Sequence, residues 1–273
     1  MMISTQQLSD HIAQALLEDV GDGDITAGLV DPGVSASATI ITRESGVLCG
    51  VDFANETFRQ VDSACTLTWE AADGDAIAAD QVLCRLSGPA RALLTAERTA
   101  LNFLQLLSGT ATNASQYAAR VAHTKVKLLD TRKTVPGLRL AQKYAVTCGG
   151  CHNHRIGLFD AFLIKENHIT SHKSLKNLVN KAINTKKTIT VEIENLKQLN
   201  QILGFKFKRI LFDNMKIKNL KKCLKICKNK YETEYSGNAN LKNINRISRT
   251  GIDRISVGSI THSSQSFDTS LLI

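Results

Sequence analysis

The apolar residues near the start of the chain repeat with a helical period. Every fourth position from Leu8 to Leu16 is apolar, so residues 5–19 present one hydrophobic face, as an amphipathic helix does. Ser4 or Thr5 is a candidate N-cap, because a hydroxyl can accept a hydrogen bond from the first free backbone N–H groups. The pattern predicts a surface helix over residues 5–19.

Two apolar runs and a second helix follow within the first hundred residues. Residues 35–43 and 81–88 are bounded by Gly/Asp turns and are predicted to be strands. Residues 91–109 have a strong helical pattern, and Ser108-Gly109 is predicted to break it. This part of the chain is expected to form a small α+β unit.

After residue 110 the pattern changes to short apolar runs that alternate with amphipathic helical segments. The predicted strands are KVKLLD (125–130), DAFLIK (160–165), TITVEIE (188–194), KRILFD (208–213), ETEYS (232–236) and DRISVG (253–258). Regular strand–helix alternation favours a parallel sheet or barrel, so the fold class is predicted to be α/β.

Polar clusters follow each of the six predicted strands. In order they are Asp130-Thr131-Arg132-Lys133, Lys165-Glu166-Asn167-His168, Glu192 with Glu194, Asp213-Asn214, Ser236-Gly237-Asn238 and Gly258-Ser259. In a barrel the carboxyl ends of the strands open onto one face, which is where active sites lie. We therefore expect the six clusters to converge on one site.

Composition excludes several classes of protein. The 273 residues are 43% hydrophobic, and there is no apolar run of about 18 residues of the kind that crosses a membrane. The N-terminal stretch lacks the basic region and the small-residue cleavage site of a signal peptide. The seven cysteines are an odd, scattered set. We interpret them as reduced thiols of a cytoplasmic protein.

The net charge of +9 is unevenly distributed. Residues 1–168 hold 14 Lys and Arg against 18 Asp and Glu, whereas residues 169–273 hold 20 against 7. A basic half raises the alternative of nucleic-acid binding. However, alanine falls sharply where lysine, asparagine and isoleucine rise, and many lysines occupy the solvent side of predicted helices. This favours a compositional bias, and we predict neither a nucleic-acid nor a membrane partner.

The stretch CGGCHNHR (148–155) permits three interpretations. Cys148-Gly-Gly-Cys151-His152 has the letters of a c-type haem attachment site, which a cytoplasmic protein would not use. Two cysteines with His152 and His154 resemble zinc ligands. His154-Arg155 instead forms a cationic corner that suits an anion.

The residues expected to converge divide by charge. The cationic set is Arg132, Lys133, His154, Arg155 and Lys165. Arginine forks and lysine ammonium groups suit carboxylates and phosphates, so an anionic ligand is expected.

Two acidic residues and two glycine-containing turns complete the expected site. Glu194 and Asp213 could hold Mg²⁺ beside a phosphate, although one of Glu192 and Glu194 could instead be a structural partner. Backbone N–H groups at Ser236-Gly237-Asn238 and Gly258-Ser259 suit a phosphate. The implied ligands are a phosphorylated, metal-bound substrate and a small carboxylate.

Residues 128–169 closely resemble the signature stretch of the quinolinate phosphoribosyltransferases. The similarity extends over nearly the whole chain, through EDVGDGDIT (18–26), ITRESGVLCG (41–50), LLTAERTALNFLQLLSGTAT (93–112), VEIENL, LFDN, YSGN and TGIDRISVGSITH. The resemblance implies an enzyme of NAD biosynthesis that converts quinolinate and phosphoribosyl pyrophosphate to nicotinate mononucleotide, pyrophosphate and CO₂, with Mg²⁺.

The resemblance also implies an architecture. Residues 1–110, joined by the tail 265–273, would form an N-terminal α/β sandwich domain, and residues 111–264 an incomplete α/β barrel. The family forms homodimers in which the N-terminal domain of one subunit covers the barrel mouth of the other, and Arg98 would enter the site across that interface.

Roles carried over by motif match complete the implied site. Arg132, His154, Arg155 and Lys165 would hold the quinolinate carboxylates. Lys133, Glu194 and Asp213 would act on the pyrophosphate and its metal. The substrate-binding set is Arg98, Thr131, Arg132, His154, Arg155, Lys165, Ser236, Gly237, Asn238, Val257, Gly258 and Ser259, of which the glycine-containing turns would take the 5′-phosphate.

Two departures from the family pattern are visible. Cys151 stands where the family commonly has a small residue, and the back half is rich in lysine. A transferase of another base, a nucleic-acid-associated protein and a metalloprotein at 148–154 remain alternatives.

Overall fold

The computed structural model describes residues 3–165, 168, 175–185, 187–227 and 230–273. Its contacts divide the chain into two compact units. Unit 1 comprises Met1–Ser115, Leu140–Gly150 and Ser263–Ile273, and unit 2 comprises Gln116–Arg139 and Cys151–His262.

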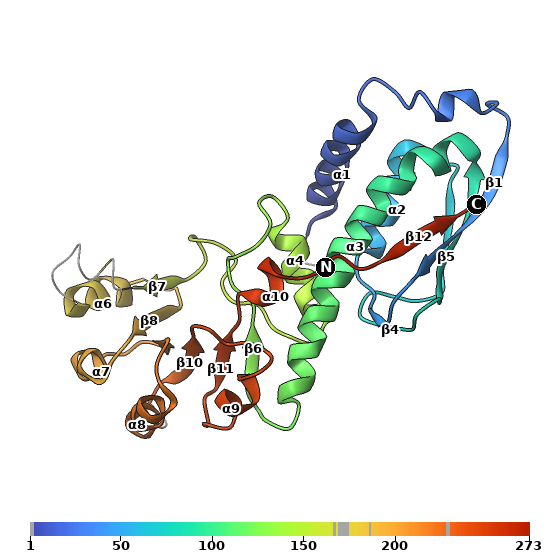
Figure 1. Cartoon of the computed structure of the whole chain (residues 1–273). Coiled ribbons are helices and arrows are strands. Elements are labelled where there is room, and N and C mark those ends of the chain that lie inside the picture. Colours follow the sequence, from blue (N-terminus) through green and yellow to red (C-terminus); the bar gives the residue numbers. More distant parts are fainter. Residues whose placement is uncertain (1–2, 166–167, 169–174, 186, 228–229) are drawn as a thin grey trace. The chain divides into compact units, whose positions relative to one another are not determined.

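Unit 1 is built on an antiparallel sheet of four strands in the order β12-β1-β5-β3 (Figure 1). The strands are β1 (Ser35–Thr42), β3 (Thr66–Trp69), β5 (Val82–Pro89) and β12 (Thr269–Leu272), and a separate ribbon joins β2 (Gly46–Val47) to β4 (Ala76–Ile77). Along the second half of β1 every other residue is buried, which is the period of a strand with one face on the core. The tail strand β12 pairs with β1, with Thr39 opposite Leu272.

Unit 1 also contains helices. They are α1 (Thr5–Val20), the short 3₁₀ helix η1 (Ala27–Leu29), α2 (Val51–Val61), α3 (Ala90–Val121) and α4 (Arg139–Cys148). Of these, α2 and α3 pack on the sheet. Ser4 is the N-cap of α1, one of the two candidates that the sequence offered, and with Gln7 it also forms a reciprocal capping box. Phe58, Leu83, Leu93 and others form one buried cluster between sheet and helices.

The predicted break at Ser108-Gly109 was wrong, because α3 continues to Val121. Gly109 has a packing role instead: a Cβ there would lie 1.9 Å from the carbonyl oxygen of Gln265. Ser108 uses its hydroxyl to bond both the backbone N–H and the carbonyl of Cys49. Tertiary contacts therefore explain two residues that locally resemble a helix end.

Unit 2 is built on six parallel strands in the order β6-β11-β10-β9-β8-β7 (Figure 1). They are β6 (Lys127–Leu129), β7 (Phe162–Ile164), β8 (Ile189–Ile193), β9 (Arg209–Asp213), β10 (Glu232–Ser236) and β11 (Arg254–Ser256). All six predicted strands are present, and the predicted α/β fold class is confirmed. In the described part of the chain β6 and β7 are the outer strands, so the sheet is open.

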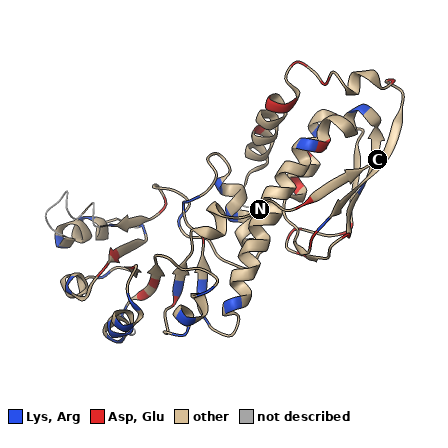
Figure 2. Ribbon diagram, viewed as in Figure 1, with Lys and Arg blue, Asp and Glu red and all other residues tan. Residues whose placement is uncertain are grey.

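Among the described residues of unit 2, one helix follows each of the strands β7 to β11. These helices are α6 (Leu175–Ile183), α7 (Leu196–Ile202), α8 (Ile217–Cys227), α9 (Ile244–Ser248) and α10 (Ser259–His262). On α8, Leu220, Cys223 and Cys227 are buried while the lysines are exposed, so those lysines belong to a solvated face (Figure 2). Among the described residues, no helix combines the length and apolar composition needed to cross a bilayer.

Candidate functional site at the carboxyl ends of the parallel strands

A pocket of about 700 Å³ lies within unit 2, where the six parallel strands end. Its lining includes twelve of the predicted site residues: Thr131, Arg132, Lys133, His154, Arg155, Lys165, Asp213, Ser236, Gly237, Asn238, Gly258 and Ser259. They come from loops after β6, β7, β9, β10 and β11 and from the loop between α4 and β7. The structure thus brings these residues together as the strand pattern predicted.

Arg132 and Arg155 make this pocket strongly cationic. Nε of Arg132 is buried without a hydrogen-bond partner in the described structure. Burial lowers the pKa of Arg155, and the charge of Arg132 lowers it further, which shows that the two guanidinium groups repel each other. An anion bound between them would relieve this repulsion and bond the orphaned Nε.

The backbone around Arg155 holds its side chain in place. One guanidinium nitrogen of Arg155 donates to the carbonyl of Ala161 at 3.0 Å. The Asp160 carboxylate accepts hydrogen bonds from the backbone N–H groups of Ile156 and Gly157, at 2.8 and 3.1 Å. Burial raises the pKa of Asp160, but backbone hydrogen bonds, including these two, and the charge of Arg155 together lower it by more. The loop is therefore closed around a charged carboxylate beside the arginine.

His154 is fixed on three sides. Its backbone N–H donates to Asp130 at 2.8 Å, and its Nδ1 accepts from the backbone N–H of Arg155 at 2.7 Å. The proton of a neutral imidazole then resides on Nε2, which lies 3.2 Å from Oε1 of Glu234. The orientation of the His154 ring is set before any ligand binds.

Glu234 is fully buried beneath this histidine. Burial raises its pKa, but hydrogen bonding and charge from His154 and a hydrogen bond from Ser256 lower it by more, so the net shift is downward. Its other oxygen, Oε2, lies 3.5 Å from the Arg209 guanidinium without a hydrogen bond. We interpret Glu234 as an ionised support for His154.

The acidic side of the pocket consists of Glu192 and Asp213. Oε2 of Glu192 lies 3.0 Å from Nζ of Lys165. Glu194 was expected at this position, but it is exposed and does not belong to the pocket lining. Because β8 ends at Ile193, Glu194 falls in the turn before α7, where its backbone N–H bonds Gln198.

The loops after β10 and β11 form a polar, tightly folded side of the pocket. Gly237 has φ +96°, and a Cβ there would lie 2.7 Å from the backbone nitrogen of Asn214. Only glycine combines that conformation with that approach. Gly258 has Lys133 and His262 against it, and Ser259 shares a 2.8 Å hydrogen bond with the Tyr117 hydroxyl.

Three predicted residues lie elsewhere. Val257 is buried, and its backbone N–H donates to the carbonyl of Leu129 within the sheet. Arg98 lies on α3 in unit 1, with 59% of its side chain exposed. Glu194 is the third.

Several lining residues were missed by sequence reasoning: Leu163, Leu211, Glu234, Ala239, Asn240, Ser256 and His262. Strand alternation contained a signal for some of them, since Glu234 and Ser256 precede Ser236 and Gly258 by two residues and therefore share their face. The predicted Glu166 and Asn167 lie outside the described residues. His168 accepts a hydrogen bond through Nδ1 from the backbone of Lys165.

The CGGCHNHR stretch separates into different roles. His154 and Arg155 line the pocket, whereas Cys151 is buried and His152 is exposed. Within the described part of the chain, no group of three or more His, Cys, Asp or Glu side chains is arranged to hold a metal ion. This geometry favours the anion-binding interpretation over zinc.

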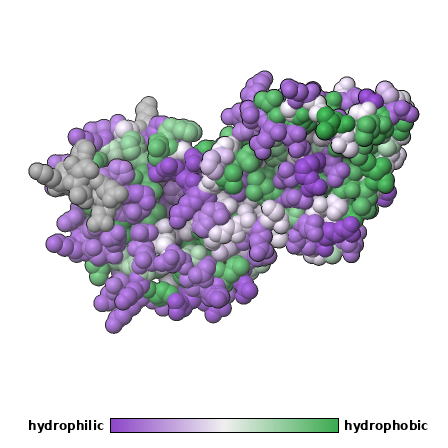
Figure 3. Space-filling model, turned by 45° about the horizontal axis from the view of Figure 1, so that its top comes forward, coloured by the Kyte–Doolittle hydropathy of each residue, from purple (hydrophilic) through white to green (hydrophobic). Residues whose placement is uncertain are grey.

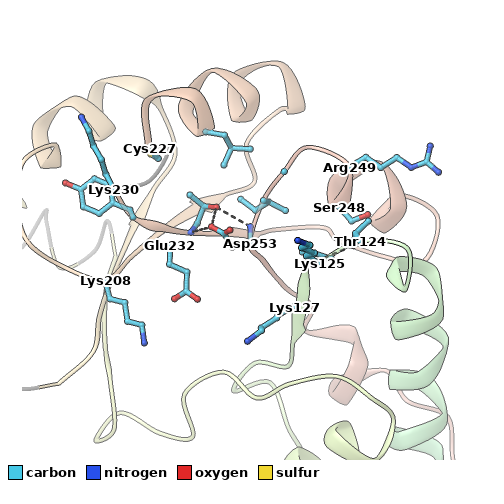
Figure 4. Close-up of a pocket in the computed structure, with 16 residues that line it drawn as sticks. Thr124, Lys125, Lys127, Lys208, Cys227, Lys230, Glu232, Ser248, Arg249 and Asp253 are labelled. Atoms are coloured by element: carbon cyan, nitrogen blue, oxygen red, sulfur yellow. Dashed lines mark hydrogen bonds between the residues drawn. The ribbon is translucent and has the colours of Figure 1, made fainter.

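A larger cavity, of about 1010 Å³, lies at the opposite, amino-terminal ends of the strands (Figure 4). Lys127 and Lys208 border it, and Glu232 there is bonded to Arg209 and Arg254. Chemistry in α/β barrels is located at the carboxyl ends. The smaller pocket is therefore the candidate active site despite its size.

Comparison with known families identifies matches along most of the chain. The family described as "Quinolinate phosphoribosyl transferase, N-terminal domain" matches residues 24–108, and "Quinolinate phosphoribosyl transferase, C-terminal domain" matches residues 110–272.

Individual relatives agree with these matches. A probable nicotinate-nucleotide pyrophosphorylase [carboxylating] of Bacillus subtilis is 36% identical over 268 residues, covering 97% of this chain and 93% of the relative. The chloroplastic nicotinate-nucleotide pyrophosphorylase [carboxylating] of Oryza sativa is 37% identical, covering 98% and 78%. The solved nicotinate-nucleotide pyrophosphorylase of Francisella tularensis superposes with a TM-score of 0.94 at 44% identity, covering 98% of this chain and 96% of that one.

Proposed function

The chain belongs to the quinolinate phosphoribosyltransferase family, and we propose that it forms nicotinate mononucleotide in the pocket at the carboxyl ends of β6 to β11. The enzymes of this family are phosphoribosyltransferases of NAD biosynthesis. The observation that carries the assignment of the site is the pair of repelling guanidinium groups, Arg132 and Arg155, on one wall of a pocket whose other walls are polar and acidic.

Quinolinate, a dicarboxylate, would bind on the cationic wall. Nε of Arg132 supplies an unused donor, and Arg155 supplies the second fork. His154, with its proton on Nε2 and its ring held by Glu234, and Lys165 would complete a shell for two carboxylates. Each charge-assisted hydrogen bond contributes about 1.5–3 kcal/mol, so two forks are enough to orient the pyridine ring.

Phosphoribosyl pyrophosphate would lie across the remaining walls. The turns at Ser236-Gly237-Asn238 and Gly258-Ser259 offer backbone and hydroxyl groups to the 5′-phosphate, and Thr131 and Lys133 would contact the pyrophosphate. Asp213, with Glu192 rather than Glu194, would take part in holding Mg²⁺. Two carboxylates suit an ion that keeps several waters and is shared with substrate phosphates. Bound Mg²⁺ would neutralise charge on the leaving pyrophosphate.

The chemistry requires orientation and charge stabilisation more than covalent participation. The pyridine nitrogen attacks the ribose C1 carbon as pyrophosphate leaves, with positive charge developing on the ribose. Lys133 would stabilise the departing oxygens. The ring nitrogen is then quaternary and positive, so it stabilises the electron pair left on C2 when the C2 carboxylate departs as CO₂, and a proton from solvent adds to C2 to give the product. Arg132 and Arg155 hold that carboxylate until the ring is charged.

We propose further that the protein is a homodimer in which Arg98 enters the site of the partner. On the described surface of unit 1, Ile25 and Leu29 are 89% and 85% exposed, and Leu94 is 39% exposed. Leu94 and Arg98 are four residues apart on α3 and share a helix face. Figure 3 shows apolar surface gathered on this unit, as expected of a face that a partner covers.

The expected location is the cytoplasm, which agrees with cysteines that form no disulfide among the described residues. The plant relatives are named as chloroplastic or mitochondrial proteins, so the location is a separate question from the activity. Fractionation of source cells with an antibody to the chain would decide it.

The direct test of function is release of labelled CO₂ from carboxyl-labelled quinolinate. We expect release that requires phosphoribosyl pyrophosphate and Mg²⁺ and equals the nicotinate mononucleotide formed. Nicotinate in place of quinolinate serves as the specificity control, because one carboxylate leaves the cationic wall half satisfied. Equal turnover of nicotinate, or no product from folded protein, would contradict the proposal.

A further inference from the structure

Two thiols in unit 1 are in contact although they are far apart in the chain. Sγ of Cys49 lies 3.8 Å from Sγ of Cys148. Cys49 is buried directly before α2, and Cys148 is the half-buried last residue of α4. The proposed reaction uses neither thiol.

Hydrogen bonds fix the backbone around Cys49 and tie it to the helix that carries Cys148. Ser108 bonds the N–H and the carbonyl of Cys49. Asp73 accepts from the N–H groups of Gly50 and Val51 at the start of α2, at 2.8 and 3.0 Å, and from the Tyr144 hydroxyl on α4 at 2.9 Å. Asp73 therefore links the start of α2, which follows Cys49, to α4, which carries Cys148, so the proximity of the two thiols is built into the fold.

The two sulfurs differ in acidity. The Cys49 thiol donates a hydrogen bond to Cys148, which lowers the pKa of Cys148 against the effects of burial and Asp73. The same hydrogen bond, together with burial, raises the pKa of Cys49. Cys148 is the more exposed sulfur and the one that ionises first, which are the properties of an attacking thiolate.

We propose that Cys49 and Cys148 form a redox modification site at which a hydroperoxide converts the two thiols to a disulfide. The Cys148 thiolate attacks one peroxide oxygen, the O–O bond breaks, and an alcohol or water leaves, so that Cys148 becomes a sulfenic acid. Cys49 then loses its proton and attacks the Cys148 sulfur, and water leaves as the S–S bond forms. Together the thiols lose two electrons and two protons, which the peroxide takes up. A dithiol reverses the reaction.

The disulfide also has a consequence for the active site, and this part rests on the proposed function. An S–S bond is about 2.0 Å long, so the sulfurs must approach by nearly half of their 3.8 Å separation. The backbone at Gly149 is packed too closely to absorb this movement, because even a Cβ there would lie 2.2 Å from the carbonyl oxygen of Ala111. The displacement would then pass along the chain to His154 and Arg155, where small misplacements reduce catalysis. We expect the oxidised enzyme to lose activity and to regain it with dithiothreitol.

The experiment treats the whole protein with hydrogen peroxide and maps cross-linked peptides by non-reducing digestion and mass spectrometry. We expect a peptide pair joining Cys49 to Cys148, with the loss of two hydrogen atoms. The pair should be absent from Cys49→Ser and Cys148→Ser and present in Cys151→Ser, the matched control from the same motif. Cys49→Ala, checked by thermal melting, guards against a serine variant that fails to fold.

Two results would overturn the modification site: a Cys148–Cys151 cross-link in its place, or oxidation of Cys148 to sulfinic acid without any cross-link. Quinolinate-dependent activity is measured on the same samples. Cross-linked protein of undiminished activity would refute the consequence for the active site but keep the modification site. Untreated protein without activity would instead contradict the proposed function. The cross-link result would still test the modification site, because it does not depend on activity.

Discussion

At the scale of single residues, the site depends on two arginines, Arg132 and Arg155, that line the same pocket. Nε of Arg132 is buried and has no hydrogen-bond partner among the described residues, and the charge of Arg132 lowers the pKa of Arg155. Such an arrangement costs stability unless a ligand compensates it, because a buried charge needs hydrogen bonds or an opposite charge. The sequence predicted both arginines as ligands of an anion. In the structure both line one pocket, and their positive charges repel each other.

We predict that Arg132→Ala lowers kcat/KM for quinolinate by about 10- to 150-fold, the equivalent of one charge-assisted hydrogen bond. Steady-state kinetics with varied quinolinate measure this. Lys208→Ala, in the cavity at the amino-terminal ends of the strands, is the matched control and should retain full activity. An equal loss of kcat/KM in both variants would mean that the overall charge of unit 2 determines activity, and that this pocket has no special role.

The buried Glu234 predicts a pH dependence of stability. Its folded pKa is lowered below the ordinary value of 4.5, so its ionisation stabilises the protein above that pH, and the contribution disappears as the pH falls through the folded pKa. Glu234→Gln should therefore unfold at a lower temperature than the wild type at pH 7, and the gap should narrow below about pH 4.5. Thermal melts from pH 7 to pH 3 measure the gap, and a constant gap would exclude this linkage.

At the scale of elements, α3 shows how packing overrides a local signal. Ser108-Gly109 is typical of a helix end, yet the helix continues because Gln265 packs directly against the Gly109 backbone. Glycine is present here for close approach and not for termination.

Gly109→Ala should therefore destabilise the protein although alanine is the better helix former. Overpacking of this kind costs about 1–3 kcal/mol, which corresponds to a fall of roughly 2–4 °C in Tm for each kcal/mol in a chain of this size. Gly33→Ala, which meets open space, is the control and should leave Tm nearly unchanged. A gain in stability from Gly109→Ala would show that helix propensity dominates after all.

The turn after β10 provides a second test at this scale. Gly237 and Gly204 have nearly equal φ values, +96° and +93°, but only Gly237 is packed against a neighbour and lines the pocket. Alanine at either position carries the same backbone strain. Gly237→Ala should raise KM for phosphoribosyl pyrophosphate, whereas Gly204→Ala should lower Tm without changing KM. Kinetics and melting curves on both variants separate strain from loss of the phosphate site.

At the scale of the whole molecule, the proposed dimer predicts that two subunits with different substitutions complement each other in a heterodimer. If Arg98 enters the partner's site, a heterodimer of Arg98→Ala and Arg132→Ala subunits contains one site with both arginines intact. Mixing the two impaired variants, after dissociation and reassociation, should raise the activity above that of either variant alone. Light scattering on the mixed sample measures its molar mass and so confirms that it is dimeric. No recovery from confirmed heterodimers would place Arg98 and Arg132 in the same subunit's site or remove Arg98 from it.

The sequence by itself determined the α/β class, the six parallel strands and most of the pocket, from Thr131 to Ser259. These follow from local periodicity: strands and helices have fixed repeats, and strand ends in a parallel sheet must meet. The quoted motifs then supplied the chemistry, because they match a family along nearly the whole chain.

Tertiary structure decided what depends on distant neighbours. It placed Glu192 in the pocket and Glu194 in a turn, because only the end of β8 fixes which carboxylate faces inward. It continued α3 through Gly109, and it put Cys148 against Cys49, which is 99 positions away. A local pattern gives the period of a segment but contains no information about the residues that pack against it. These features are therefore determined only when the chain folds.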